Sequence, residues 1–459
     1  MIVLATFWQR VLKIGMLACA TFAALQTNAQ PVPAPTREVS LPAPSAPARD
    51  LFAKYKDRLI QVRVLLNSAS EQSSLGSGFF VRDDGDKGAL LVTNYHVVSS
   101  LAIDPHKYRI EIRQTSEESA KATLVAVDVL NDLALLRMAP RAAKAAPTLQ
   151  VRDTMPKQGE KLFALGNPME LGFLISEGVF NGLVESRIND HMLFSGAINS
   201  GMSGGPAIDD YGRVAGVNVS VLRDGQLLSF LVPSRFVTAL IERGADAAPR
   251  KEWRSEIGKQ LTAHQALITA KLFGEAPAAT NRVGDAKAGF STQKLDTRDV
   301  TTLDGSLTKC WANANDGDSP RYRADTLRCS LKSEVFVRRG LSSGSIAINH
   351  SLLRKDKLAT PQFLAMGSVA RQFTGYFRTH SADLTDSRCG EDYFKGKLHV
   401  YRVTTCMEAF RKFDGLYRLS MSAMQVDDVN ERILTGLTLN GFSFDNAQRI
   451  SRDFLERLQ

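Results

Sequence analysis

Gly201-Met202-Ser203-Gly204-Gly205-Pro206 is the stretch that decides how this chain folds and which chemistry it suits. Ser203 has glycine two positions before it and directly after it, which indicates a sharp turn with an exposed hydroxyl group. Acyl transfer by such a hydroxyl also needs backbone N–H groups directed at the point where a carbonyl oxygen becomes negative. Gly/Ser turns are common, so this stretch indicates a nucleophile only if a histidine base and an orienting acid accompany it.

A histidine and an aspartate with suitable flanks lie upstream of the serine. Leu90–Val98 (LLVTNYHVV) has the pattern of an apolar strand that runs into His96. Asn131–Leu136 (NDLALL) puts Asp132 directly before a second apolar run. Taken singly, each is open to a structural interpretation, as a half-buried core histidine or as a capped strand or helix. The order His96, Asp132, Ser203 matches the chain order of the triad in chymotrypsin, not that in subtilisin or the α/β-hydrolases.

With these stretches in place, residues 50–242 resemble the trypsin-like serine peptidases of bacteria, in particular the HtrA-type branch. The collinear matches are GSGFF (76–80), TNYHVV (93–98), NDLALL (131–136), LGNP (165–168), GAINSGMSGGP (196–206) and FLVPS (230–234). Two features depart from that branch. Met202 stands where asparagine or aspartate is usual, and the PDZ domain expected after the protease is not visible.

The resemblance implies a role for each residue of the triad. Ser203 Oγ would attack the scissile carbonyl, His96 would act as general base and then as general acid, and Asp132 would orient the imidazole. The backbone N–H groups of Gly201 and Ser203 would form the oxyanion hole. This chemistry needs no metal ion and no organic cofactor, so none is expected.

The resemblance also implies where the substrate side chain before the cut would bind. The residue six positions before the nucleophile, which is Ala197, would lie at the base of that pocket, followed by Ile198. Val217, Asn218 and Val219 would form the opposite wall. Neither Ala197 nor Ile198 carries a charge, so a substrate Lys or Arg buried in this pocket would lack a partner. Cleavage after small or medium aliphatic residues of unfolded or extended polypeptide is therefore expected.

The N-terminus predicts export. Residues 1–29 combine positive charge, the apolar run Ile14–Leu25 and small residues before Gln30, as in a cleavable signal peptide. That run is too short for a membrane span, and no later stretch qualifies. A lipoprotein anchored at Cys19 is the competing interpretation, which the bulky Leu17 disfavours. The mature protein is expected in a Gram-negative periplasm or outside the cell.

The cysteines agree with export. After removal of the signal, Cys310, Cys329, Cys389 and Cys406 remain, all of them in the last third of the chain. An even count in a secreted region favours two disulfides, expected between neighbours in sequence, 310 with 329 and 389 with 406. A zinc site is the alternative, but there is no Cys-x-x-Cys pair among the four.

Composition and patterning divide the chain into five segments. They are a signal peptide (1–29), a proline-rich disordered tether (30–49), the protease domain (50–243), a helix and linker (244–299), and an α+β domain of unknown role (300–459). The linker proper is expected from 274 to 299, after a helix at 253–273. Strands in the last domain are expected near 334–338, 345–348 and 399–404, and a helix at 445–458. The expected fold is thus mostly β, a chymotrypsin-like double β-barrel followed by a helical linker and a separate α+β domain.

The charge of the chain excludes one class of partner. The 459 residues carry a formal net charge of +9, but the basic residues are dispersed and no nucleic-acid-binding motif appears. Attraction to anionic lipid headgroups or to acidic client proteins, and the oligomeric state, are left open. The sequence therefore predicts an exported serine endopeptidase. The alternative is a catalytically weak protease-fold protein that binds peptides or the cell envelope through its C-terminal domain.

Overall fold

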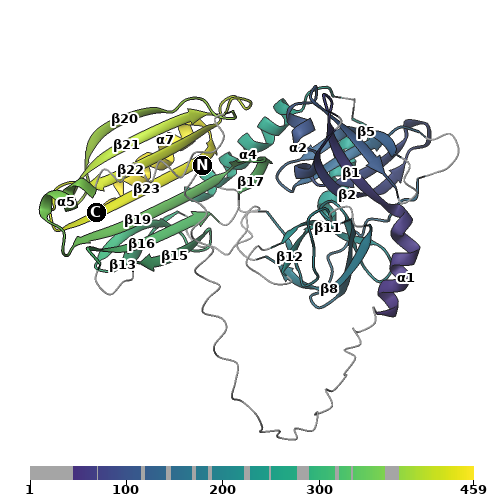
Figure 1. Cartoon of the computed structure of the whole chain (residues 1–459), viewed down its shortest axis with the longest axis horizontal. Helices are drawn as coiled ribbons and strands as arrows, with labels where there is room; N and C mark the ends of the chain where they lie inside the picture. The colour runs from purple at the N-terminus through teal and green to yellow at the C-terminus, as the bar shows by residue number, and fades with distance from the viewer. Residues whose placement is uncertain are drawn as a thin grey trace, which may run out of the picture. The chain divides into compact units, whose positions relative to one another are not determined.

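Two closed antiparallel β-barrels carry the stretches that resemble a protease (Figure 1). The first contains β1 (Leu59–Leu66), β2 (Gln72–Asp83), β3 (Ala89–Thr93), β4 (Tyr108–Arg113), β5 (Ser119–Asp128) and β6 (Leu133–Met138), in the order β1-β2-β3-β6-β5-β4. The second contains β7 (Lys161–Gly166), β8 (Leu174–Leu183), β9 (Met192–Phe194), β10 (Pro206–Ile208), β11 (Val214–Val221) and β12 (Ser229–Pro233), in the order β10-β11-β12-β9-β8-β7. The predicted double barrel is confirmed.

The computed structural model describes residues 45–69, 71–114, 119–140, 146–167, 172–184, 189–221, 228–247, 250–275, 289–315, 320–331, 334–366 and 382–459. The predicted signal peptide and most of the predicted proline-rich tether lie outside these residues. The described residues from Ser45 to Gln459 belong to one compact unit. No helix within the described ranges has the length and apolar character needed to cross a membrane.

Strand β3 shows why a continuous apolar run folds as part of a barrel here. All five of its residues are buried. Leu91 points into the first-barrel core, which also holds Ile60 and Val62. Leu90 and Val92 join a second cluster, the inter-barrel core, with residues from both barrels. Because successive side chains of a strand point to opposite faces, both faces of β3 need apolar residues.

Among the described residues, four helices flank the barrels. They are α1 (Ala46–Tyr55), α2 (Tyr95–Ile103), α3 (Ser234–Gly244) and α4 (Arg254–Leu272), with 3-10 turns at Lys56–Arg58 and Gly85–Lys87. The predicted helix at 253–273 is confirmed as α4. The predicted tether is wrong for residues 46–49, since these form the first turn of α1. Ser45 caps that turn by accepting a hydrogen bond from the Ala48 N–H (3.2 Å), and proline is tolerated at such an N-terminus.

The C-terminal domain is a seven-stranded antiparallel sheet in the order β15-β16-β19-β23-β22-β21-β20. Its strands are β15 (Thr308–Ala314), β16 (Tyr322–Leu331), β19 (Ser345–Lys355), β20 (Arg388–Lys395), β21 (Val400–Ala409), β22 (Tyr417–Gln425) and β23 (Glu431–Phe442). Two helices, α5 (Thr360–Ala365) and α7 (Phe444–Glu456), and two hairpins, β13 (Phe290–Leu295) with β14 (Arg298–Leu303) and β17 (Val335–Arg338) with β18 (Leu341–Ser343), complete the described domain. The predicted linker is therefore wrong from residue 290 onward, where the first of these hairpins begins.

Helix α4 belongs to two cores at once. Near its start, Ile257 and Leu261 pack in the first-barrel core. Near its end, Ile268 and Leu272 pack in the core of the C-terminal sheet. Their i, i+4, i+11 and i+15 spacing keeps all four on one stripe of the helix. A single helix thus connects the apolar interior of the protease part with that of the sheet.

Both edges of the C-terminal sheet are cross-linked to the neighbouring strand. Disulfides join Cys310 of β15 to Cys329 of β16, and Cys389 of β20 to Cys406 of β21. In each pair the two cysteines are direct partners in the strand register. An edge strand has hydrogen-bonded neighbours on one side only, so a cross-link there restrains the strand that would otherwise separate most readily.

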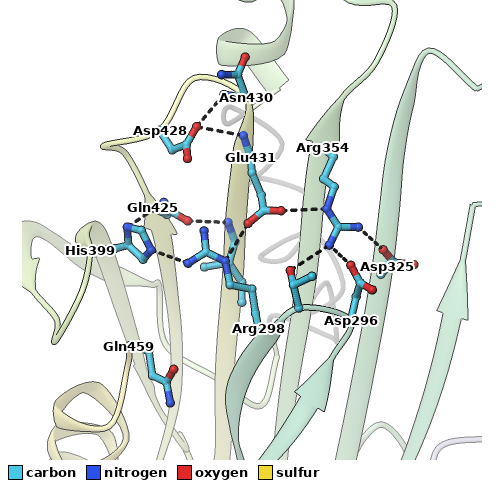
Figure 2. A network of polar contacts seen from close by, with 12 residues as sticks. Asp296, Arg298, Asp325, Arg354, His399, Gln425, Asp428, Asn430, Glu431 and Gln459 are labelled. Carbon is cyan, nitrogen blue, oxygen red and sulfur yellow. Dashed lines mark hydrogen bonds and ion pairs between the residues drawn. The ribbon is translucent and has the colours of Figure 1, made fainter.

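A polar network fastens the β13–β14 hairpin to the sheet (Figure 2). Arg354 on β19 binds Glu431 of β23 (2.8 Å), Asp325 of β16 (3.0 Å) and Asp296 of the hairpin turn. Arg298 at the start of β14 binds the same Glu431 (2.7 Å). Two arginines thus share one carboxylate, which links three strands of the sheet and the hairpin through charge-assisted hydrogen bonds.

Candidate active site

His96 and Asp132 form a close pair. Strand β3 ends at Thr93, and His96 is the second residue of α2. The Nδ1 atom of His96 lies 2.6 Å from Asp132 Oδ2, and the backbone N–H of His96 donates to Asp132 Oδ1 at 2.8 Å. Both carboxylate oxygens therefore contact His96, which fixes the plane of its ring. The second ring nitrogen, Nε2, is not used in this contact.

The backbone around Asp132 holds that carboxylate in place. Asp132 has φ 53°, a left-handed conformation that is uncommon for a residue with a side chain. The Asp128 carboxylate supports the turn by accepting from the Asn131 N–H at 3.1 Å. The Asp132 carbonyl accepts from the Tyr95 N–H (3.1 Å) and from Asn94 Nδ2 (2.8 Å). Sparsely populated backbone conformations that the surroundings enforce are frequent at functional sites.

Asp132 also sets the charge state of His96. Burial alone lowers the pKa of this imidazole, but the negative charge of Asp132 and its hydrogen bond raise it, and the net pKa lies above 6.5. An imidazolium beside this carboxylate is therefore more stable than one in water. A histidine that has to accept a proton during a reaction gains from this arrangement.

Ser203 lies on the turn before β10, half-buried, with its hydroxyl directed at β11. Its Oγ donates to the Val219 carbonyl at 3.0 Å. Among the described residues, no hydrogen bond joins Ser203 to His96. In the predicted mechanism the hydroxyl has to exchange the Val219 carbonyl for the histidine before it can pass on its proton. Long or misdirected catalytic hydrogen bonds are common without substrate.

Ser77 on β2 holds the loop that carries Ser203. Its hydroxyl donates to the Gly201 carbonyl (2.7 Å) and accepts from the Asn167 N–H (2.9 Å), and its own N–H donates to the Ser203 carbonyl (2.7 Å). Gly204 has φ 86°, and a Cβ there would lie 2.3 Å from the Ser77 carbonyl oxygen. Ser77 lies in the GSGFF stretch, but no sequence pattern indicates this role or the contact that it makes between the barrels.

The two expected oxyanion donors are available. The N–H groups of Gly201 and Ser203 have no hydrogen-bond partner among the residues that the structure describes, while the carbonyls of both residues are bound by Ser77. Gly201 has φ 94°, a conformation that favours glycine. Backbone N–H groups without a partner at these two positions are compatible with the predicted oxyanion hole, which stays a prediction.

Met202 is an interior residue. Its fully buried side chain packs in the second-barrel core with Phe194, Ile198 and Leu231. Its carbonyl accepts from the Gly205 N–H (3.0 Å) and from Asn218 Nδ2 (3.3 Å). The turn around the serine is thus held by apolar packing and by Asn218, not by a polar side chain at position 202.

The residues predicted to form the substrate pocket differ in how deeply they are buried. Ile198 is buried in the second-barrel core, and Ala197 beside it is half-buried. Asn218 is buried and donates to the Leu165 carbonyl (2.9 Å). Val217 and Val219 both pack in the inter-barrel core, where Val217 is fully buried and Val219 lies at the edge. Val217 and Asn218 are enclosed by protein, whereas Val219 also lines the cleft beside His96. The predicted pocket stays a prediction.

Beside His96 there is a cleft of about 800 Å³. Its lining from the protease part is His96, Val129, Leu130, Asp132, Asn189, His191 and Val219. Its lining from the C-terminal domain is Arg328, Ser330, Leu331, Glu334, Val335, Phe336, Ser345, Ile346 and Ala347. The lining combines apolar side chains with the charged side chains of Asp132, Arg328 and Glu334. Sequence reasoning assigned none of the C-terminal residues to this site.

Comparison with known proteins finds a peptidase family model and several proteases similar to part of this chain. Residues 76–217 match the family model of a trypsin-like peptidase domain. Human serine protease HTRA3 is 28% identical over 233 residues, which cover 48% of each chain. A probable periplasmic serine endoprotease, DegP-like, from Bartonella henselae is 31% identical over 248 residues, 50% of this chain and 47% of that one. The solved serine endoprotease of Yersinia pestis is 24% identical, with a TM-score of 0.36, over 44% of this chain and 66% of its own.

The chain spans about half the length of the curated relatives it matches. The residues that match the family model, 76–217, run from β2 to β11 and so lie within the two barrels. The segment that matches the family contains His96, Asp132 and Ser203, together with Ser77 and Gly201. Residues 76–217 are thus a trypsin-like peptidase domain with HtrA-type and DegP-like relatives.

Proposed function

We propose that this protein is a serine endopeptidase that cleaves extended or unfolded polypeptide. The observation that carries the proposal is the His96–Asp132 pair, in which both carboxylate oxygens bind the histidine. It lies in a trypsin-like peptidase domain, together with a serine loop whose N–H groups at Gly201 and Ser203 are free to donate. These are the parts that acyl transfer requires.

The chemistry follows from their positions. Ser203 Oγ leaves the Val219 carbonyl, gives its proton to His96 Nε2 and attacks the substrate carbonyl carbon. The carbonyl oxygen becomes negative and accepts hydrogen bonds from the Gly201 and Ser203 N–H groups. Collapse of this intermediate breaks the C–N bond, and the imidazolium returns the proton to the departing amine. Water, deprotonated by His96, then hydrolyses the acyl-enzyme.

The proposed specificity is for small or medium aliphatic side chains before the cut. Ala197 and Ile198 bring no charge to this region, and the neighbouring second-barrel core is apolar. A substrate Lys or Arg there would be desolvated without a partner, at a cost of several kcal/mol. A methylene more or less would change discrimination by only about 1–3 kcal/mol, so the preference among aliphatic residues should be shallow.

We also propose that the protein works in the periplasm or outside the cell. The predicted signal peptide supports export, and so do the two disulfides, which persist in oxidising compartments. The DegP-like relatives carry names that place those proteins in the periplasm. Chains with and without residues 1–29, expressed in a Gram-negative host and fractionated, test this location.

The activity is tested by labelling the purified protein with a fluorophosphonate and by digesting reduced casein. The wild-type chain should be labelled and should produce new termini, while Ser203→Ala and His96→Ala should do neither and remain folded. Ser200→Ala is the matched control, because Ser200 is an exposed serine on the same loop. A wild-type protein that resists labelling and leaves casein intact would refute the proposal.

A second function has one observation in its favour. Ser203 donates to Val219 instead of His96, which is also what a peptide-binding protein with weak turnover would show. In that case casein would bind to the wild-type protein and to Ser203→Ala alike, without cleavage and without fluorophosphonate labelling. The intact His96–Asp132 pair favours the enzyme.

A further inference from the structure

The β17–β18 hairpin of the C-terminal domain packs directly on the helix that carries His96. Its Val335, Val337 and Leu341 are buried in the first-barrel core, which also contains the α2 residues Val97 and Val98. The hydroxyl of the fully buried Tyr95 donates to the Val337 carbonyl at 2.8 Å. Tyr95 precedes His96, so the hairpin is bound to the residue next to the candidate base.

The other end of α2 is held electrostatically. Asp104, which follows the helix, accepts from Lys412 (2.6 Å) and Arg254 (3.1 Å), and Arg338 at the end of β17 lies 3.6 Å away. Burial raises the pKa of Asp104, but the hydrogen bond from Lys412 and the surrounding cations outweigh it and lower the pKa. The hairpin is thus fixed to both ends of α2.

Phe336 projects from this fixed hairpin into the cleft. Alternation along β17 places it on the face opposite Val335 and Val337, and it remains 37% exposed. Its ring meets the His96 ring edge-on, with centroids 6.1 Å apart and planes at 80°. Val219 and Ile346 line the same cleft. Phe336, Val219 and Ile346 thus bring apolar side chains from both domains to one cleft beside His96.

We propose that the C-terminal domain forms one wall of the substrate cleft, with Phe336 as a specificity-determining residue for an apolar side chain of an extended peptide. This inference rests on the proposed peptidase activity. The contacts with Tyr95 and Asp104 hold the hairpin in place. Phe336 on this hairpin then contacts a substrate side chain near the scissile bond. The chain then binds substrate between two domains instead of within the barrels alone.

The cleft favours a substrate wall over an autoinhibitory plug. About 800 Å³ of space remains beside Phe336, enough for several side chains of an extended segment. The Val335–Arg338 strand is paired with β18 and does not enter the cleft as a peptide would. Removal of a plug would raise activity, whereas removal of a binding wall would lower it, so the two roles predict opposite kinetics.

The test uses the full chain and a set of quenched peptides in which each residue before the cut is in turn Leu or its near-isostere Asn. For wild type we expect a preference for Leu at one position. Phe336→Ala should lose about tenfold in kcat/KM for that Leu peptide, through KM, with little change for the Asn peptide. Phe336→Leu should restore most of the loss. Tyr95→Phe should shift KM in the same direction, because it removes the hydrogen bond that joins the hairpin to the start of α2.

Two controls separate this inference from the activity on which it rests. Tyr393→Ala removes an exposed aromatic ring on β20 that does not line the cleft, and should leave all rates unchanged. Fluorophosphonate labelling needs no contact with the wall and should proceed equally in wild type and Phe336→Ala. If wild type is labelled but Phe336→Ala keeps the wild-type KM for both peptides, or gains activity, the inference is wrong while the peptidase stands. If wild type is inert toward probe and peptides, the proposed function itself fails.

Discussion

Acidification should destabilise this protein through two buried histidines, His264 on α4 and His350 on β19. They are 2% and 1% exposed, respectively. Neither ring nitrogen of His264 has a hydrogen-bond partner among the described residues, and the ring lies under the β18–β19 turn, where a Cβ on Gly344 would come within 2.6 Å of Nδ1. His350 is bonded to Thr435 Oγ1 (2.9 Å) and to the Thr301 carbonyl (2.8 Å).

Burial is the main cause of a lowered pKa at both sites, to about 4 in each case, from an ordinary value of 6.5. Both histidines are therefore neutral in the folded protein at pH 5, while the unfolded chain binds a proton at each. The two histidines therefore do not lower the free energy of unfolding above pH 6.5. They lower it increasingly as the pH falls from 6.5 toward 4, because the unfolded chain binds protons that the folded protein does not. The proton-binding equilibria give a loss of about 2 kcal/mol per histidine at pH 5 and approach about 3 kcal/mol at lower pH.

The assay is urea unfolding at pH 7.5 and pH 5, followed by circular dichroism, in a Ser203→Ala background that prevents self-digestion. The free energy of unfolding should fall by about 4 kcal/mol in total from these two sites. His264→Leu should remove about half of that pH dependence, because it replaces an unpartnered buried imidazole by an apolar group of similar size. His106→Gln is the control, since His106 is largely exposed. An unchanged pH dependence in His264→Leu would refute the reasoning.

Three further predictions concern the site and the cross-links. Ser77→Ala should lower kcat by about 10- to 100-fold with little change in KM, because the loop that carries the oxyanion donors loses its hydrogen bonds to Ser77 Oγ. Hydrolysis of a small ester measures both constants, and an equal rise in KM would contradict the prediction. Asp132→Asn should lower kcat by about 10⁴-fold. It should also move the acid limb of the pH–rate profile to lower pH, because it removes the charge that raises the pKa of His96. An acid limb at the wild-type pH would contradict the role of Asp132. Cys310→Ser with Cys329→Ser should cost about 3 kcal/mol of stability, seen in urea unfolding, while fluorophosphonate labelling persists in the folded variant.

The barrels could be predicted because their determinants are local. The apolar run before His96, the turn at Asp132 and the glycines around Ser203 each act through neighbouring residues, and their order identified the fold. The failures have different causes. Phe290 and Leu295 are the two large apolar residues of β13, so a Gly- and Ala-rich context concealed that strand. Its attachment depends on charge pairs with strands far along the chain, which no periodicity reveals.

The depth of the predicted wall residues and the position of the β17–β18 hairpin could not be predicted, for a geometric reason. Val217 and Val219 are two positions apart, so they share a face of β11 and pack in the same core at different depths. Sequence spacing gives the face but not the depth, and only depth decides which valine borders a cleft. Phe336 carries no motif at all, and its meaning comes from the 6.1 Å between its ring and that of His96. Contacts across 240 residues of chain are invisible to local patterns.

Helix α4 couples the stability of the barrels to that of the C-terminal sheet. Ile257 and Leu261 are buried with the first barrel, whereas Ile268 and Leu272 are buried with the C-terminal sheet. His264 sits between these pairs on the same buried stripe. Removing either pair from its core would expose part of one continuous helix, so the barrels and the sheet cannot lose their packing independently at this point. A proton on His264 should therefore weaken the packing of α4 between the two cores. If the proposed cleft binds substrate, its wall from the C-terminal domain depends on that packing.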